Sequence, residues 1–319
     1  MRILTGIQPS GTPHIGNYFG YFKQNIDLLG EEENLLMMVD LHALTTVQSP
    51  DDLRKYRQEL SKDFLACGFD PSKGTLFFQS YVPEHTELMW ILSCVTPMGL
   101  LERAVSYKDK VKRGLEANVG LFAYPVLQAA DILLYGADTV PVGKDQIQHI
   151  EIARDIAQKF NNRYGDGLLT IPEARVVPEV AVIPGTDGQK MSKSYGNVIP
   201  MFAEESVIKK AIMGIVTDSK GVDEPKNPKT CIVYQLHALL LDDAGKKELA
   251  ETYKAGGLGY GDAKKNFFED CMDYFGSMRK KREALKDAEV IAVIEEGSAY
   301  AREIAHKTME RVRKAVGLR

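Results

Sequence analysis

Short apolar runs alternate with longer segments of helical periodicity over the first eighty residues, and this alternation constrains the fold more than any other feature. Residues 1–4, 34–39 and 75–79 are predicted strands, and residues 14–29 and 50–67 are predicted helices. Strands that alternate with helices in this way favour a parallel sheet with helices packed on its faces. We therefore predict an α/β fold for this part of the chain.

The remainder of the chain changes character near residue 200. Residues 84–160 are mostly helical by period, and residues 174–183 return to short strand-like runs. Beyond residue 200 only helical patterns follow, which places the main domain boundary there. The predicted helices of this second part are 204–216, 230–241, 246–253, 262–286 and 288–316.

Composition limits the class of protein. Hydrophobic residues make up 44% of the 319 residues and charged residues 26%, so the chain can bury a large core and is not a disordered protein. The net charge of −4 means that a nucleic-acid partner would have to bind local basic patches. We predict no DNA partner.

Cysteine usage and apolar run lengths indicate the compartment. The four cysteines are widely spaced and form no C-x-x-C pair, which argues against a zinc or iron–sulfur site and suits a reducing compartment. No apolar run approaches the roughly 18 residues of a membrane span, and a Gly/Pro segment begins too early for a signal peptide. We expect a cytoplasmic protein with no membrane contact.

A Gly- and Pro-containing segment at 6–17 joins the first predicted strand to the first predicted helix. The N-terminus of a helix offers unpaired N–H groups and a partial positive charge, which suit phosphate. Gly16 would let an adenine or ribose approach the backbone, and His14 could donate to a phosphate oxygen. The alternative is a simple turn that precedes a helix.

A second polar loop, at 185–194, contains Lys190, Ser192, Lys193 and Ser194 after a predicted strand. Flexible cations and hydroxyls on a mobile loop suit the departure of pyrophosphate, because negative charge grows on the leaving oxygens. The alternative is an exposed linker, and the presence of the first loop in the same chain argues against it.

Tyr124, Gln128 and Asp131 are spaced i, i+4, i+7 and so share one face of a predicted helix with apolar neighbours. A carboxylate in such surroundings needs a partner, which a ligand N–H or O–H could supply. The alternatives are a helix cap or a structural salt bridge. Asp145 and Gln146, which follow Gly143, suit ribose hydroxyls and an ammonium group. The segment is not a P-loop, since Asp145 stands where Ser or Thr is required.

Together these motifs resemble those of class I aminoacyl-tRNA synthetases, and most closely the bacterial tryptophanyl group. The HIGH-type motif reads His14-Ile15-Gly16-Asn17, and the KMSKS motif is intact at 190–194. The G-x-Q-P-S-G opening at 6–11, A-A-D-I-L-L at 129–134 and P-V-G-x-D-Q at 141–146 are similar to the tryptophanyl runs. The resemblance covers essentially the whole chain.

The resemblance implies a Rossmann-like parallel-sheet catalytic domain at 1–199 with a helical insertion at about 84–160. It also implies an all-helical anticodon-binding domain at 200–296 and a C-terminal helix at 297–319 that packs back on the catalytic domain. Such enzymes are homodimers that use ATP with Mg²⁺, activate L-tryptophan and charge tRNA(Trp), and no protein-bound metal is expected.

The resemblance also implies a role for individual residues. The catalytic residues are His14, Lys190 and Lys193. The ATP-binding residues are Gln8, Pro9, Ser10, Gly16, Asn17, Gly143, Lys144, Asp145, Val182, Lys190, Met191, Ser192, Lys193 and Ser194. The tryptophan pocket consists of Asp131, Tyr124, Gln146, Gln128, His42, Val140 and Val142, with Asp131 accepting the indole N–H.

Two positions depart from the tryptophanyl pattern and keep alternatives open. Asn17 stands where the HIGH motif has a second His, as is common in tryptophanyl enzymes. Gln128 stands where many of these enzymes have Met, and Tyr-x-x-x-Gln-x-x-Asp is the tyrosyl pattern. The alternatives are a tyrosyl enzyme, a small-molecule nucleotidyltransferase and a non-catalytic tRNA-binding paralogue.

Basic residues at 279–282 and at 311–314 could contact tRNA phosphates. The alternative is a solvated helix face, which is the more common origin of a charge run.

Overall fold

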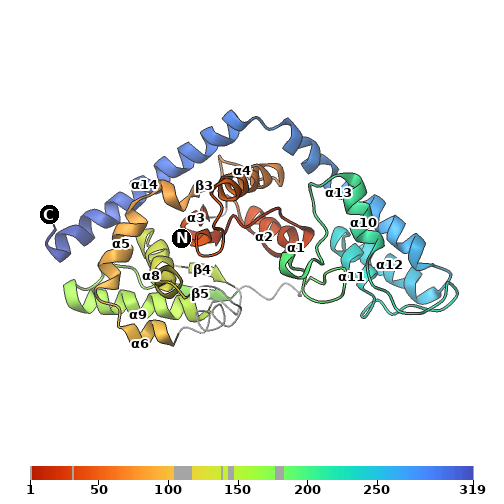
Figure 1. The fold of residues 1–319 in the computed structure, drawn as a ribbon, viewed down its shortest axis with the longest axis horizontal. Helices are drawn as coiled ribbons and strands as arrows, with labels where there is room; N and C mark the ends of the chain where they lie inside the picture. Colours follow the sequence, from red (N-terminus) through yellow and green to blue (C-terminus); the bar gives the residue numbers. More distant parts are fainter. Residues whose placement is uncertain are drawn as a thin grey trace.

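The computed structural model has a five-stranded sheet in the order β3-β2-β1-β4-β5, in which every neighbouring pair is parallel. This confirms the predicted α/β fold (Figure 1). The strands are β1 Arg2–Ile7, β2 Glu33–Met38, β3 Thr75–Phe78, β4 Thr139–Val142 and β5 Glu173–Val176. The structure describes residues 2–30, 32–103, 117–137, 139–142, 147–176 and 183–318.

The strand order has a switch point between β1 and β4. From β1 the chain moves outward to β2 and β3, then returns to the other side of β1 and continues through β4 to β5. Open α/β sheets bind ligands beyond the carboxyl ends of the strands at such a point. The His14 loop follows β1, so the topology places it at the expected position for a ligand.

Consecutive residues of β2 enter two different apolar clusters. Leu35 and Met37 belong to one cluster, and Leu36 and Met38 belong to the other, as the two-residue period of a strand requires. Since both faces are buried, the strand is a continuous apolar run. The first face is covered by α5 Glu84–Ser93, α8 Val119–Leu134, α9 Ile147–Tyr164 and α14 Asp287–Val316, with α6 Met98–Glu102 against α8.

The second face is covered by the helical turns after β1 and by a helix that precedes β3. The segment after β1 has a π-helical turn in its middle and buries Tyr18, Phe19 and Phe22. Its Tyr18 ring lies 5.1 Å from the ring of Phe275, between centroids. These elements are α1 Ile15–Asn17, η1 Tyr18–Phe22, α2 Lys23–Asp27 and α4 Pro50–Ala66, with the short turns α3 Asp40–Ala43 and η2 Gln79–Tyr81 nearby.

The helical part after residue 200 shares this second apolar cluster with the sheet. Phe22 and Leu36 belong to the same buried cluster as Phe267 and Phe275. The two parts therefore have no separate cores on this side. The helices are α10 Glu205–Met213, α11 Ile232–His237, η5 Ala238–Leu240, α12 Asp243–Ala255 and α13 Tyr260–Ala284, and no strand occurs among the described residues beyond Val176.

Helix α14 crosses the edge of the sheet at β3 and ends beside α5 (Figure 1). A Cβ on Gly297 would stand 3.0 Å from the carbonyl carbon of Leu76 and closer still to its oxygen, so only glycine fits. The helix thus covers a strand edge that would otherwise be open to pairing. The predicted boundary between residues 296 and 297 falls within this continuous helix, and the division into domains remains a prediction.

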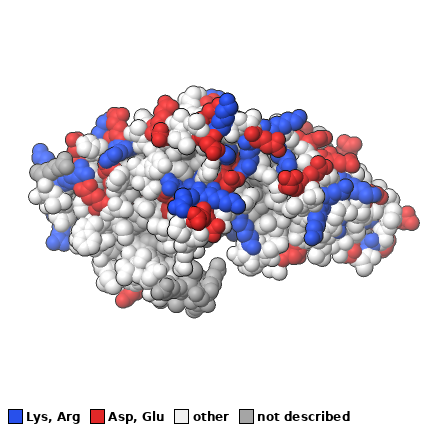
Figure 2. All heavy atoms as spheres, turned by 45° about the horizontal axis from the view of Figure 1, so that its top comes forward, with Lys and Arg blue, Asp and Glu red and all other residues white. Residues whose placement is uncertain are grey.

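Two of the basic residues considered for tRNA contact, Arg282 and Arg313, form ion pairs within the protein. Arg282 donates from Nε to Asp63 Oδ1 at 2.6 Å and also pairs with Glu59, which ties α13 to α4. Arg313 pairs with Glu87 of α5. Figure 2 shows Lys and Arg side chains interspersed with Asp and Glu over the visible face. For Arg282 and Arg313 the structure therefore provides a structural role.

Candidate active site

His14 is the N-cap of α1, and its imidazole is held in one tautomer. Its Nδ1 accepts the Asn17 backbone N–H at 3.3 Å, and the Asn17 side chain accepts the His14 backbone N–H at 3.2 Å. A ring nitrogen that accepts carries no proton, so the proton of the neutral ring is on Nε2. Burial lowers the pKa of His14 to about 4, and Lys193 adds to this shift. At neutral pH His14 is therefore an uncharged donor through Nε2.

The loop that contains His14 meets the loop that contains Lys193. Lys193 donates from Nζ to the Ser10 carbonyl at 3.2 Å across 183 positions of sequence. The Ile15 N–H donates to the Ile199 carbonyl at 3.0 Å, and a Cβ on Gly16 would stand 3.2 Å from Met191 Sδ. The two motifs thus form one site, as binding of a single triphosphate by both requires.

Asn197 holds the second loop in shape from inside the protein. It is 2% exposed, and its Oδ1 accepts the Ser192 N–H at 2.8 Å. Its Nδ2 donates to Asp187 Oδ1 at 2.7 Å and to the Lys190 carbonyl at 3.1 Å. A Cβ on Gly185 would stand 2.8 Å from the Asn197 carbonyl oxygen, so the loop needs glycine there. Sequence analysis did not single out Asn197.

The exposed part of this loop carries the cationic side chains. Lys193 opens the short turn η4 Lys193–Tyr195, and partial desolvation lowers its pKa, which the Asp63 carboxylate opposes. Lys190 and Ser194 are exposed on the same loop, whereas Met191 is buried beneath it. The arrangement offers cations and hydroxyls at the surface and anchors the loop from below.

The other predicted nucleotide-binding residues are only partly described. Gln8, Pro9 and Ser10 directly follow β1, with Pro9 buried and Ser10 exposed. The remaining predicted residues of the nucleotide and ammonium sites lie outside the described residues. These are Gly143, Lys144, Asp145, Gln146 and Val182.

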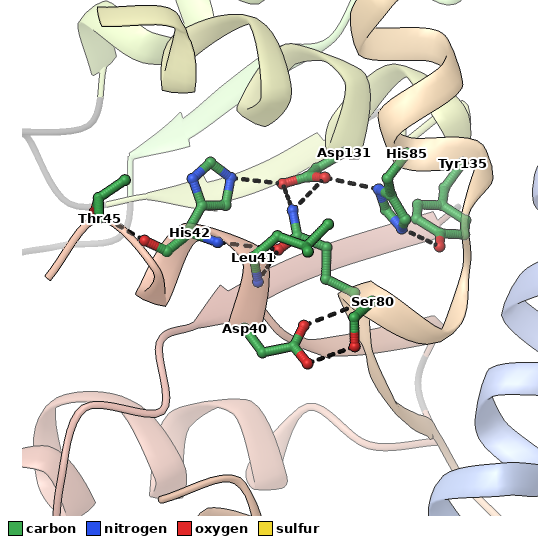
Figure 3. A network of polar contacts seen from close by, with 9 residues as sticks. Asp40, Leu41, His42, Thr45, Ser80, His85, Asp131 and Tyr135 are labelled. Atoms are coloured by element: carbon green, nitrogen blue, oxygen red, sulfur yellow. Dashed lines mark hydrogen bonds and ion pairs between the residues drawn. The ribbon is translucent and has the colours of Figure 1, made fainter. Parts of the chain in front are cut away.

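Asp131 on α8 is 2% exposed and is surrounded by polar side chains of the protein. His42 Nε2 lies 2.9 Å from Oδ2, and His85 Nδ1 lies 2.7 Å from Oδ1 (Figure 3). The Gln79 amide donates to both oxygens at 2.8 Å. Burial acts to raise the pKa of Asp131, but His85 and His42 outweigh it and hold that pKa well below its usual value. The carboxylate is therefore ionised.

These contacts bear on the predicted role of Asp131. A carboxylate has about four lone-pair positions; His42 and the Gln79 amide make hydrogen bonds to three of them, and the His85 ring lies against Oδ1 at ion-pair distance. The protein itself supplies the partners that the buried Asp131 carboxylate requires. Of these partners, the sequence pointed to His42 but not to Gln79 or His85. A ligand N–H could reach Asp131 only by exchange with one of these donors.

Tyr124 and His42 lie beside this carboxylate. The two rings meet edge to face with centroids 6.1 Å apart, and the Tyr124 hydroxyl lies 2.9 Å from His149 Nε2. Both His149 and Tyr124 are buried, while Gln128 is half-buried one turn further along α8. The predicted pocket residues Val140, which is buried, and Val142 both belong to β4. The structure thus brings three of the predicted pocket residues, Tyr124, His42 and Asp131, together.

Comparison with known proteins now identifies the family. Residues 1–313 match the family described as tRNA synthetases class I (W and Y). The chain belongs to this family. A tryptophan–tRNA ligase of Fusobacterium nucleatum is 49% identical over 319 residues, which cover 99% of this chain and 98% of that protein. The tryptophan–tRNA ligase of Rhodopirellula baltica is 49% identical over 321 residues, which cover 100% of this chain and 100% of that protein.

Solved structures of class I synthetases have the same fold. The tryptophanyl-tRNA synthetase of Campylobacter jejuni in complex with ADP and tryptophan has a TM-score of 0.95 at 48% identity, over 99% of this chain and 100% of that one. The Mycoplasma pneumoniae enzyme has a TM-score of 0.81 at 31% identity, over 99% of this chain and 97% of that one. The resemblance drawn from the sequence motifs is thereby confirmed.

Proposed function

We propose that this chain uses ATP to activate L-tryptophan as tryptophanyl-adenylate and then transfers the amino acid to tRNA(Trp), with release of pyrophosphate and AMP. The observation that carries the proposal is the meeting of the His14 and Lys193 loops, in a chain that also contains the buried, ionised Asp131. The tryptophan–tRNA ligases of similar length, at 49% identity over nearly the whole chain, support the choice of amino acid.

The first step is attack of a tryptophan carboxylate oxygen on the α-phosphorus of ATP. A P–O bond forms to the amino acid, the bond to the β-phosphate oxygen breaks, and pyrophosphate leaves with its negative charge. No protein nucleophile is needed, so catalysis depends on positioning and on charge stabilisation. His14 donates through Nε2, and Lys190 and Lys193 supply positive charge to the leaving oxygens.

In the second step a hydroxyl of the tRNA 3′-terminal ribose attacks the adenylate carbonyl carbon, and AMP leaves. The loop that contains Lys193 is suited to close late, because its cations are exposed while Asn197 holds its base. A loop that strengthens its contacts as charge develops stabilises the transition state in preference to the bound substrates.

Mg²⁺ is proposed to enter with ATP. The described loops present lysines, hydroxyls and an uncharged imidazole, a donor set that suits phosphate oxygens and not a resident cation. Mg²⁺ is commonly held through substrate phosphates and water, with few protein ligands. When bound, it would neutralise part of the phosphate charge.

Amino-acid-dependent ATP–pyrophosphate exchange with a panel of amino acids tests the proposal. We expect exchange with tryptophan and none with tyrosine or phenylalanine. Exchange with tyrosine alone would favour the tyrosyl alternative, which the Tyr124-x-x-x-Gln128-x-x-Asp131 pattern supports. Exchange with no amino acid would contradict both and favour the non-catalytic paralogue.

Asp131→Asn tests the specificity role at nearly constant volume. Hydrogen bonds to charged groups are each worth about 1.5–3 kcal/mol, so kcat/KM for tryptophan should fall about 10- to 100-fold. The KM for ATP should change little, since the polar contacts of Asp131 within the described residues go to His42, Gln79 and His85 and not to either loop. An unchanged kcat/KM for tryptophan would contradict a role for Asp131 in the pocket.

A homodimer is part of the proposal. Trp90 on α5 is 73% exposed, and Met98 on α6 and Val119 at the start of α8 are exposed on the same helical insertion. Exposed apolar side chains of this size suit an interface between two copies. Light scattering on the purified chain would give twice the mass of one chain.

The proposed activity also implies that the protein acts in the cytoplasm, where tRNA is charged. Within the described ranges, no helix is long and apolar enough to cross a membrane.

A further inference from the structure

We propose that Gln79, His85 and Tyr135 are positioning residues for amino-acid selection, because they fix the Asp131 carboxylate so that only Oδ2, on the side of His42, can receive a donor from the substrate. The inference rests on the proposed function. It extends that function from the carboxylate itself to the residues that aim it.

Gln79 fixes the plane of the carboxylate. Its Oε1 accepts the backbone N–H of Leu41 at 3.1 Å and that of His42 at 3.4 Å, at the start of α3. Since Oε1 faces two donors, the amide nitrogen must be the end that faces Asp131. This nitrogen is 2.8 Å from both carboxylate oxygens, and Gln79 is fully buried. The positions between the two oxygens are therefore closed to a ligand.

His85 occupies the outer side of Oδ1, and Tyr135 determines its tautomer. The His85 Nδ1 contacts Oδ1 at 2.7 Å, and Nε2 lies 2.8 Å from the Tyr135 hydroxyl (Figure 3). Burial raises the pKa of Tyr135, and Asp131 and Glu84 raise it further, so the phenol keeps its proton. When the phenol donates to Nε2, the proton of a neutral ring is on Nδ1 and faces Asp131.

Among the described partners of Asp131, His42 is the least enclosed, at 6% exposure against 0% for Gln79 and His85. Gln79 and His85 are both fully buried and are each held from their far end, by backbone N–H groups and by Tyr135 respectively. The His42 ring contacts Asp131 through Nε2 and meets the Tyr124 ring edge to face. The Oδ2 position that His42 occupies is consequently the one open to exchange with a substrate donor.

This arrangement explains how the pocket would select its amino acid. An indole N–H that replaces His42 leaves the carboxylate with a full set of donors. A phenylalanine side chain in the same place would remove a donor and supply none, and a site that hydrogen-bonds its substrate rejects such analogues strongly. Because Gln79 and His85 prevent rotation of the carboxylate, it cannot turn to find another partner.

Two pairs of variants test the inference by tryptophan-dependent ATP–pyrophosphate exchange. In the first pair, Tyr135→Phe removes one buried hydroxyl, and the matched control Tyr253→Phe does the same in the helical part, away from the site. Loss of one hydrogen bond should raise the KM for tryptophan about 3- to 10-fold for Tyr135→Phe. The KM for ATP should stay within twofold, and the control should leave both constants unchanged.

The second pair separates donation from packing at His85. The amide nitrogen of Asn can take the place of Nδ1, whereas that of Gln takes the place of Nε2. We expect His85→Asn to keep the tryptophan KM within about threefold of the wild type, and His85→Gln to raise it about 30-fold or more. Circular dichroism would establish that each variant folds. If neither His85 variant folds, the result for Tyr135→Phe decides.

Equal losses in both His85 variants, a parallel rise in the KM for ATP, or a wild-type tryptophan KM in Tyr135→Phe would overturn the inference. A wild-type chain that shows no tryptophan-dependent exchange would instead overturn the proposed function. The two failures are therefore distinguishable in one set of assays.

Discussion

Asn197→Asp is the sharpest test of how the Lys193 loop is held. The substitution keeps the size of the side chain, and one oxygen can still accept the Ser192 N–H. The other now faces the Lys190 carbonyl at a distance of 3.1 Å, where the amide had donated. It also faces Asp187, whose pKa the Asn197 amide lowers at present. Two favourable contacts thus become repulsive.

The expected cost follows from these contacts. Loss of the buried hydrogen bond from Asn197 to the Lys190 carbonyl leaves two oxygens facing each other, which costs about 2–3 kcal/mol. Repulsion from Asp187 is not included, because solvent screens it. This cost destabilises the closed form of the Lys193 loop, so kcat/KM for ATP should drop about 30- to 150-fold. The KM for tryptophan should remain near its wild-type value, because the Asn197 side chain bonds to Ser192, Asp187 and Lys190 and not to the residues around Asp131.

ATP–pyrophosphate exchange at varied ATP and at varied tryptophan measures both constants. Asn161→Asp is a matched control, since Asn161 is also buried, accepts the Leu169 N–H at 2.9 Å and donates to the Leu169 carbonyl at 2.8 Å, away from the loop. It should lower thermal stability and leave the KM for ATP unchanged. Equal effects of the two substitutions on ATP kinetics would refute a specific role for Asn197.

Two further predictions concern stability. Gly297→Ala should cost about 2–3 kcal/mol in the free energy of unfolding in urea, because its Cβ would overlap the backbone of β3, whereas Gly276→Ala, with no atom within 4 Å of its Cβ, should be neutral or stabilising. A loss no larger than that of the control would contradict the close contact. The pKa of His14 is lowered to about 4 in the folded protein, against about 6.5 in the unfolded chain. The neutral imidazole therefore makes its full contribution to the free energy of unfolding above pH 6.5. This contribution is lost as the pH falls toward 4, by up to about 3 kcal/mol. His14→Asn, which can still cap α1, should therefore lose less stability than the wild type between pH 6.5 and 4.5, and equal slopes in urea titrations would count against a buried neutral imidazole.

Features that depend on local periodicity could be predicted from the sequence. The strands predicted at 34–39 and 75–79 contain the apolar runs 35–39 and 76–78, as expected for strands buried on both faces, and they appear as β2 and β3. The helical period over 14–29 likewise predicts the segment that appears as α1, η1 and α2. The meeting of the two loops could be predicted only because both motifs have a chemical reason to reach one triphosphate.

Features that depend on long-range pairing could not be predicted in this way. Gln79 and His85 contact Asp131 from positions 52 and 46 residues away, and nothing local in their neighbourhoods indicates a shared carboxylate. Asn197 follows its loop closely, but an Asn near a Gly reads as a turn residue until its burial is known. Arg282 was considered for tRNA contact because its charge is visible in the sequence, while its partner Asp63 lies on a distant helix.

The apolar cluster that Phe22 and Leu36 share with Phe267 and Phe275 has a consequence for any attempt to shorten the chain. A protein cut near residue 200 would expose to water the apolar side chains after β1, such as Tyr18 and Phe19, that now pack against Phe275. Such a fragment would aggregate instead of serving as a minimal adenylate-forming unit. The helices beyond residue 200 therefore complete the hydrophobic interior of the part that carries the sheet.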